Sequence, residues 1–320
     1  MAPTPTSTSK KSGILVVDKP AGPTSFAVVE RVRRAVGARK AGHTGTLDPM
    51  ATGVLAVCLD EAVKLQHWIT ETDKGYDALV VFGFATDTED AEGRETERGD
   101  PSGLTAEGVA AALGGFVGEI DQIPPMYSAV RVGGRRLHVA ARAGEEVERA
   151  PRRVVVHALD LAGFEPAVDG LARARIAVRC GKGTYVRTLA TSLGKALGVP
   201  AHLGGLRRTA SGPFTITQAL TLDQVESLAR GAPEALAARI IRPADAVSGF
   251  PAVPVTAAEA LALAQGKVLR RAPPGPLCRA IDEAGELVAI CGPTEDMEAL
   301  RPLRVFVQTP GIAGADPGKR

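Results

Sequence analysis

The sequence contains little cysteine, few aromatic residues and no long apolar run. Its four cysteines, among 320 residues, are scattered, and its five histidines form no metal-binding pattern, so we expect no zinc site. No apolar segment approaches the roughly 18 residues that a membrane helix needs. The first residues also lack the apolar core of a signal peptide. The sequence therefore predicts a cytoplasmic protein that binds neither metal nor membrane.

The length and composition indicate a globular protein of about two domains. Hydrophobic residues make up 45% and charged residues 23%, values typical of soluble proteins. We expect a disordered tail at 1–12, rich in Ser, Thr and Pro, a first domain at 13–248 and a second at 249–310. A flexible tail at 311–320 follows. A proline-containing break near 248–254 marks the boundary between the domains.

Hydrophobic periodicity predicts strands and helices without a regular βαβ rhythm. Phe26, Val29, Val32 and Val36 recur at helical spacing and predict a helix over 25–36. The other elements that we expect are strands at 13–17, 54–59, 76–84, 154–161 and 171–180, a helix at 184–197 and a hairpin at Gly133-Gly134. This order predicts an α/β (α+β) fold, with a mixed, largely antiparallel sheet whose flanking helices form a cleft. Short strands around Gly266, 280–281, 288–291 and 305–307 predict a small C-terminal β-barrel.

The charge is unevenly distributed, although the net charge is only +2. Residues 173–208 carry eight Lys or Arg and no acid, whereas residues 71–100 carry ten acids and three bases. A basic stretch of this kind favours a polyanionic partner, and nucleic acid is the commonest one in the cytosol. The alternative is a basic surface that the acidic residues balance in space. Residues 87–100 form either a solvated loop or one that orders on binding.

The loop at 41–53 is the most unusual segment of the chain. It contains three glycines, which allow close approach of the backbone to a ligand. Asp48 is its only acid, and Arg39 and Lys40 lie just upstream. We expect Asp48 to stay ionised, because nearby positive charge lowers the pKa of a carboxyl group, and to act as a nucleophile or general base. The alternative is that Asp48-Pro49 only forms a turn.

Seven short motifs follow one another along residues 13–245. They are Gly42-His43-Thr44-Gly45-Thr46-Leu47-Asp48-Pro49, Lys19-Pro20, Lys74-Gly75-Tyr76, Thr86-Asp87-Thr88-Glu89-Asp90 through Gly93, Gln122-Ile123-Pro124-Pro125-Met126-Tyr127-Ser128-Ala129, Gly181-Lys182-Gly183-Thr184-Tyr185-Val186-Arg187 and Leu206-Arg207-Arg208-Thr209. Their residues and order resemble the TruB family of tRNA pseudouridine synthases. In position and size, the C-terminal segment resembles the small PUA RNA-binding barrel of bacterial members.

The resemblance implies isomerisation of a uridine to pseudouridine in the T-loop of tRNA, at the position conventionally numbered 55. The glycosidic N–C bond breaks, the uracil rotates, and a C–C bond forms from C5. Nothing is added or removed, so neither a cofactor nor a metal is needed. The target base must be extruded from the loop before it can react. A monomer suffices, because all the motifs lie on one chain.

The resemblance also assigns roles to individual residues. Asp48 is the nucleophile or base, and whether it attacks the sugar or removes a ribose proton stays open. Arg187 pairs with Asp48 or contacts a phosphate, and Tyr76 stacks on the extruded uracil. Four further residues bind the substrate. Tyr185 lines the pocket, Leu206 packs against the base, His43 fills the gap left by the flipped base or holds the loop, and Lys19 braces the cleft or binds phosphate.

Two other functions are compatible with parts of this pattern. A non-catalytic RNA-binding protein or tRNA-folding chaperone can use the same basic cleft, although it needs no acid that faces phosphates. A carboxylate-based hydrolase requires a second acid near Asp48, and Asp18 is the one candidate within a motif. The presence of Asp48, Tyr76 and Arg187 together favours the synthase.

Overall fold

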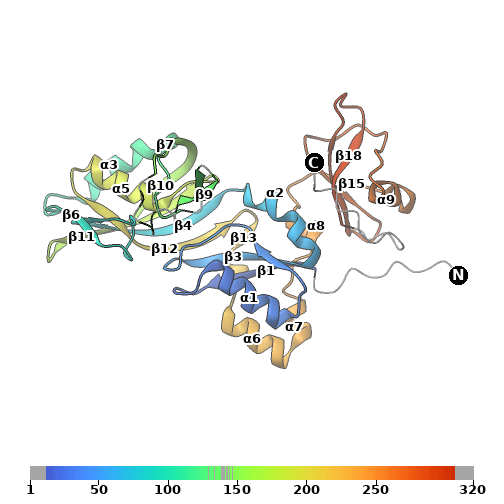
Figure 1. The fold of residues 1–320 in the computed structure, drawn as a ribbon, viewed down its shortest axis with the longest axis horizontal. Helices are drawn as coiled ribbons and strands as arrows, with labels where there is room; N and C mark the ends of the chain where they lie inside the picture. Colours follow the sequence, from blue (N-terminus) through green and yellow to red (C-terminus); the bar gives the residue numbers. More distant parts are fainter. Residues whose placement is uncertain are drawn as a thin grey trace.

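A computed structural model describes residues 12–306, except 129, 133, 138–140, 142, 144 and 146. Two sheet-based units lie side by side along its longest axis (Figure 1). The predicted terminal tails fall outside the described residues, apart from Ser12. None of the helices in the described part of the chain is long and apolar enough to cross a membrane.

A ten-stranded mixed sheet forms the larger unit. Its strands are β1 (Gly13–Lys19), β2 (Ala41–His43), β3 (Thr52–Leu59), β4 (Lys74–Phe82), β7 (Gly118–Gln122), β10 (Arg152–Val168), β11 (Leu171–Cys180), β12 (Ala201–Ser211), β13 (Phe214–Thr215) and β14 (Leu220–Thr221). Eight of them follow the order β14-β1-β3-β12-β4-β11-β10-β7, with β2 beside β3 and β13 beside β12. Among the described strands, β1 pairs with β14 and β3 with β12 in parallel, and the other pairs of this sheet are antiparallel. The predicted mixed, largely antiparallel sheet is therefore confirmed.

Helices cover opposite faces of the sheet at its two ends (Figure 1). In the described part of this unit, the helices are α1 (Ser25–Val36), α2 (Gln66–Thr70), α3 (Ala106–Leu113), α5 (Val186–Ala196), α6 (Leu222–Gly231), α7 (Pro233–Ala237) and α8 (Pro243–Ala246), with 3-10 turns η1 (Asp60–Leu65), η2 (Gly114–Phe116) and η3 (Ile216–Gln218). Helices α1 and α6 pack below the sheet on a core that includes Leu15, Val17 and Leu55. Helices α3 and α5 pack above it on a separate core that includes Val80 and Ile176.

Helix α1 has the bounds that its periodicity predicts. The Thr24 hydroxyl accepts a hydrogen bond from the backbone N–H of Ala27, and Gly37 closes the helix in the left-handed conformation at φ +68°. Val29 and Val32 are buried as expected, but Phe26 is 70% exposed. The buried face of the helix runs through Ser25, Val28 and Val32, and Phe26 lies beside this face.

Two short hairpins extend from the larger unit. Strand β5 (Phe84–Thr86) pairs with β6 (Glu95–Arg98), and β8 (Arg131–Val132) pairs with β9 (Arg135–Arg136). The second hairpin is the one predicted at Gly133-Gly134, and Gly133 itself lies outside the described residues. The first hairpin places residues 87–98 of the acidic segment in its turn and in β6, and Asp100 follows the hairpin.

The C-terminal unit is a small β domain, as predicted. Strands β15 (Ala252–Pro254), β16 (Cys278–Ile281), β17 (Leu287–Pro293) and β18 (Leu300–Val305) form a four-stranded sheet in that order, beside helix α9 (Ala257–Ala264). The strand expected around Gly266 is wrong, because this glycine turns the chain after α9 at φ +79°. Ile290 and Phe306 share an apolar cluster with Ile14 and Val16 of the larger unit, so the two units are in contact.

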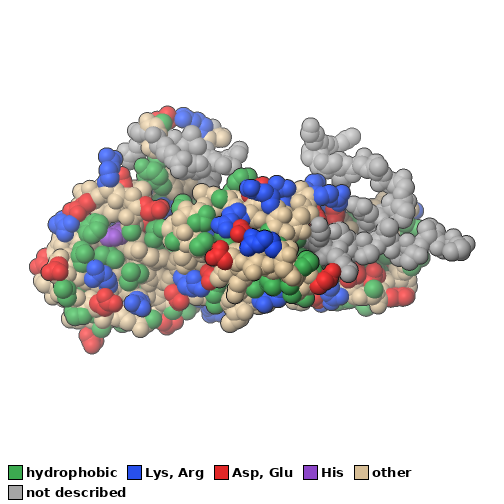
Figure 2. All heavy atoms as spheres, turned by 90° about the horizontal axis from the view of Figure 1, so that it is seen from below, with side chains coloured by type: hydrophobic (Ala, Val, Ile, Leu, Met, Phe, Trp, Pro, Cys, Tyr) green, Lys and Arg blue, Asp and Glu red, His purple; other side chains and the backbone are tan. Residues whose placement is uncertain are grey.

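The basic stretch 173–208 does not form one surface. On β11 its arginines point away from the core under α5, because they alternate with buried residues such as Ala174 and Ile176. Arg187 and Arg208 are buried, and Arg207 forms an ion pair with Asp18. Figure 2 shows the lower side of the molecule, where Lys and Arg side chains lie among Asp and Glu side chains. The eight bases of this stretch are therefore dispersed in the fold.

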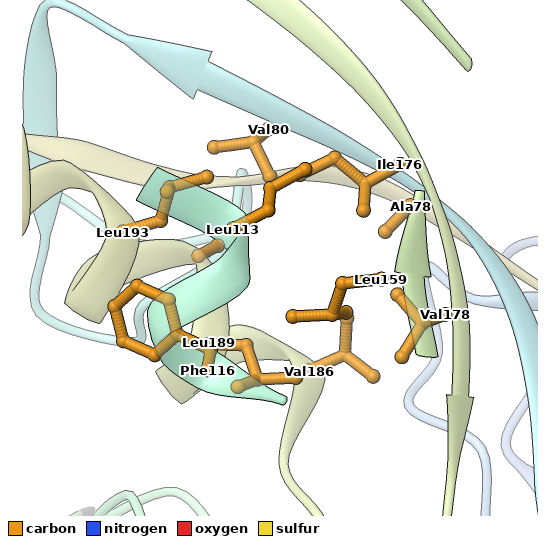
Figure 3. Close-up of a pocket in the computed structure, with 11 residues that line it drawn as sticks. Ala78, Val80, Leu113, Phe116, Leu159, Ile176, Val178, Val186, Leu189 and Leu193 are labelled. Atoms are coloured by element: carbon orange, nitrogen blue, oxygen red, sulfur yellow. The ribbon is translucent and has the colours of Figure 1, made fainter. Parts of the chain in front are cut away.

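A small cavity lies inside the core between α3, α5 and the sheet (Figure 3). Its volume is about 20 Å³, and its lining is apolar, including Ala78, Phe116, Leu159 and Leu189. A space of this size holds no more than a water molecule. The cavity is a packing gap beneath α5 and not a substrate pocket.

Gly53 permits the close approach of β3 to β12. It is the Cα partner of Arg208, its φ is +99°, and a Cβ atom there would lie 2.2 Å from the Arg208 carbonyl oxygen. We expect Gly53→Ala to lower the free energy of unfolding by about 2 kcal/mol or more, because backbone must shift. Urea denaturation measures this change.

The matched control is Gly103→Ala in an exposed loop. A Cβ at Gly103 has no neighbour within 4 Å among the described residues, and its φ is not positive. We expect its effect to stay within about 0.5 kcal/mol. Equal stability of the two variants would contradict the close approach at Gly53.

Candidate active site

Buried polar groups hold the loop between β2 and β3, residues 44–51, in place. The Lys19 side chain is fully buried, and its Nζ donates to the carbonyls of Pro20, Pro49 and Ala51 at 2.9, 3.0 and 2.7 Å. Burial lowers the pKa of Lys19 to about 8. This residue therefore lies inside the protein, where it braces the loop, and not on the surface where it would meet phosphate.

The Ser25 side chain fixes Leu47, the residue before Asp48, by two hydrogen bonds. The Ser25 hydroxyl accepts from the backbone N–H of Leu47 at 2.9 Å and donates to its carbonyl at 3.0 Å. Ser25 is buried at the start of α1, so the helix and the loop are rigidly connected. The carboxyl group of Asp48 thus projects from a backbone that is fixed on both sides.

Arg187 joins two carboxylates from separate segments. Its Nε lies 3.1 Å from Asp48 Oδ2, and its Nη1 lies 3.4 Å from Asp90 Oδ2. Nη1 also donates to the carbonyl of Thr88 at 3.0 Å, and Nη2 donates to the carbonyl of Tyr127 at 2.8 Å. Only 6% of the Arg187 side chain is exposed, so its guanidinium pairs with Asp48 and not with phosphate.

Burial raises the pKa of Asp48 above its usual value. The positive charges of Arg187 and Lys19 lower it, and Asp90 raises it further. The expectation that basic surroundings keep this pKa low is therefore wrong, because removal of the carboxylate from water is the larger effect.

Tyr76 and Leu206 lie on the same face of the sheet on neighbouring strands. Tyr76 in β4 is the Cα partner of Arg208 in β12, and Leu206 is the partner of Ala78. Both side chains are partly buried against the core below α5. Burial raises the pKa of the Tyr76 hydroxyl, and the positive charge of Arg208 opposes this shift. The phenol is therefore neutral at physiological pH.

Hydrogen bonds that involve backbone groups hold His43 and Tyr185 in place. The His43 ring accepts from the backbone N–H of Gly45 at Nδ1, 3.3 Å away, and Gln66 donates to the His43 carbonyl. Burial lowers the pKa of His43, and the charge of Arg208 lowers it further, so the ring is neutral. Gln122 binds the backbone of Tyr185 just before α5, accepting at 2.9 Å and donating at 3.2 Å.

Asp90 is a site residue that the sequence analysis did not single out. It is 4% exposed, its carbonyl accepts from the Thr86 hydroxyl at 2.7 Å, and its carboxylate faces Arg187. The one feature of the sequence that could have identified Asp90 is its place in one of the seven motifs, within the acidic residues 87–100. Part of that acidic segment therefore belongs to the site.

Asp18 does not provide the second acid that a hydrolase requires. Its two carboxylate oxygens accept from Arg207 at 3.1 and 2.7 Å, so its charge is neutralised there. The second acid beside Asp48 is Asp90, and both share Arg187. One arginine thus holds both carboxylates, whereas glycoside hydrolysis needs one carboxyl group that gives its proton to the leaving group.

Three family profiles match consecutive parts of the chain. They are described as TruB family pseudouridylate synthase (N terminal domain), over residues 33–186, tRNA pseudouridylate synthase B C-terminal domain, over 187–248, and tRNA Pseudouridine synthase II, C terminal, over 250–307.

Individual relatives agree with these profiles. The tRNA pseudouridine synthase B of Symbiobacterium thermophilum is 50% identical over 258 residues, which cover 81% of this chain and 83% of the relative. The protein of the same name from Pseudomonas aeruginosa is 42% identical over 288 residues, covering 89% and 93%. A chain in the crystal structure of a Cbf5-Nop10-Gar1 complex superposes with a TM-score of 0.68 at 27% identity, covering 94% of this chain and 85% of that chain.

Proposed function

Because the chain belongs to the TruB family of pseudouridylate synthases, we propose that it converts a uridine of tRNA to pseudouridine, at position 55 of the T-loop. The relatives at 42–50% identity that carry the name tRNA pseudouridine synthase B support this activity. The observation that carries it is the buried Arg187 that holds Asp48, because a protein that only binds RNA gains nothing from an acid placed in this way.

Asp48 starts the reaction as a nucleophile at the ribose or as a base that removes a ribose proton. The bond between N1 and C1′ breaks, the uracil rotates, and C5 bonds to C1′. The proton on C5 is then lost and N1 gains a proton, so substrate and product have the same atoms. Arg187 orients Asp48 and favours its ionised form.

The remaining site residues bind the flipped nucleotide. The ring of Tyr76 stacks on the uracil, a contact worth about 1–3 kcal/mol that offsets much of the unstacking. Leu206 packs against the base, and Tyr185 lines the pocket beside it. His43 occupies the gap in the RNA or holds the loop, and Lys19 keeps the loop in shape.

We further propose that the protein acts as a cytoplasmic monomer. One chain provides Asp48, Tyr76 and Arg187, so a second copy is not needed. Residues 13–248 form the catalytic domain, and residues 249–310 form a PUA-like domain that holds the tRNA stem. Residues 307–310 of that range lie outside the described part of the chain.

Mapping of the modified nucleotide tests the proposed substrate. A tRNA transcript is incubated with the protein, treated with a carbodiimide that marks pseudouridine, and reverse transcribed. We expect one new stop, at position 55, and none in a transcript with cytidine there. Binding without any stop would contradict the proposal and favour the tRNA-folding chaperone.

The raised pKa of Asp48 predicts an acidic limit to activity. Since the ionised carboxylate is the reactive form, the single-turnover rate falls as pH falls through this pKa. We expect the midpoint above the 3.8 that is usual for aspartate. A rate profile on tRNA, with circular dichroism recorded at each pH to verify folding, measures it. A midpoint at or below the usual value would contradict the dominant effect of burial.

A further inference from the structure

Arg208 occupies the point where three strands of the site meet. It lies in β12, between β4 and β3, and is the Cα partner of both Tyr76 and Gly53. Its side chain is one of the largest that is fully buried, with the residue 2% exposed. Arg208 is therefore out of reach of RNA phosphates, and nothing in the proposed reaction requires it to touch the substrate.

The guanidinium of Arg208 binds both sides of the site. Its Nε donates to the carbonyl of Val54 at 2.7 Å, and its Nη2 donates to the carbonyl of Gly45 at 3.0 Å. Nη1 lies 3.4 Å from the carbonyl of Thr46. Its charge also acts on the hydroxyl of Tyr76, its partner on β4. One side chain thus holds the loop that carries Asp48 and lies beside the ring that stacks on the base.

The surroundings of Arg208 are unusual for a buried cation. No carboxylate among the described residues forms an ion pair with it. A buried charge satisfied only by neutral groups is expensive, and an apolar side chain would fill the same volume at lower free energy. A contribution to stability alone does not account for an arginine at this position.

We propose that Arg208 is a positioning residue, which fixes the loop of Asp48 against Tyr76 before the RNA binds. This inference rests on the proposed function. Lys19 holds the far end of the same loop at Pro49 and Ala51, so the two buried cations fix the backbone on either side of Asp48. Arginine suits the other end of the loop because its planar guanidinium carries five donors in a fixed geometry, whereas an ammonium group carries three.

The charge of Arg208 has a second effect on the same loop. It lowers the pKa of His43, which burial already lowers, and so keeps the ring neutral. A neutral ring accepts the backbone N–H of Gly45 at Nδ1, whereas a protonated ring cannot. Arg208 therefore acts in the same direction as burial in favouring this hydrogen bond within the loop.

The variants that test this role are Arg208→Lys and Arg208→Met. Arg208→Lys keeps the positive charge but loses the planar guanidinium. Arg208→Met keeps an unbranched side chain and removes the charge. With two variants, the role stays testable if one of them does not fold. We expect the single-turnover rate at saturating enzyme to fall by about 100-fold, as expected for misplaced catalytic groups. The dissociation constant for tRNA changes little, because Arg208 does not reach the RNA.

The matched control is Arg207→Lys, one residue earlier on the same strand, where the side chain is 41% exposed and pairs with Asp18. It is expected to retain the wild-type rate. A purely structural role would lower the melting temperature of the Arg208 variants and leave the rate of the folded enzyme unchanged, which would overturn the inference. Equal rate losses in Arg207→Lys and Arg208→Lys would overturn it too. An inactive wild type would instead refute the proposed function.

Discussion

Asp48→Asn lowers the rate of pseudouridine formation by about four orders of magnitude or more, the scale of loss when an attacking group is removed from an enzyme. The substitution keeps the shape of the side chain and removes its negative charge. Neither nucleophilic attack on the ribose nor proton removal is possible for a neutral amide. Binding of tRNA persists, because Arg187 and the loop remain in place.

The control for this variant is Asp18→Asn. Asp18 is also an aspartate in a strand-end motif, but it pairs with Arg207 away from Arg187. We expect this variant to keep the rate of the wild type. Single-turnover assays on one tRNA transcript compare the three proteins, and substantial activity in Asp48→Asn would show that another acid performs the reaction.

Arg187→Met lowers both the rate and the stability. It removes the partner of Asp48 and leaves Asp90, with 6% of its side chain exposed, as an unpaired buried charge. Loss of one member of a buried pair costs about 3–5 kcal/mol. The rate falls by about 100-fold or more, because Asp48 loses the group that orients it. Urea denaturation and single-turnover kinetics measure the two effects separately.

A double variant separates these effects. Adding Asp90→Asn to Arg187→Met removes the unpaired charge, so we expect stability to recover while the rate stays low. Recovery of the rate in the double variant would mean that Arg187 serves only to neutralise Asp90. Unchanged stability in Arg187→Met would contradict the buried ion pair itself.

The sequence predicted those site residues that stand out within motifs. Asp48 is the only acid in its loop, and Arg187 follows a glycine-rich turn, so both could be selected without coordinates. Asp90 and Arg208 could not, because each is one of several like charges in its segment. Only the pairing of β12 with β3 and β4 shows which of two adjacent arginines is buried.

Predictions from the sequence were wrong where burial determines the pKa or the exposure of a side chain. The basic residues near Asp48 indicated a low pKa, but the free energy of removing the carboxylate from water outweighs their attraction. Phe26 fits the helical period of α1 and is still exposed, because the buried face is centred on Ser25, Val28 and Val32. The arginines at 173–208 are close in sequence. They point in different directions, because side chains alternate along β11 and the chain then turns into α5.

Release of tritium from tRNA labelled at C5 of uridine tests the central claim most directly. Pseudouridine formation exchanges that label for a proton, while the mass of the RNA bases is otherwise conserved. We expect the wild type to release the label from one uridine per tRNA and Asp48→Asn, which still binds, to release none. Tight binding by the wild type without any release would contradict it.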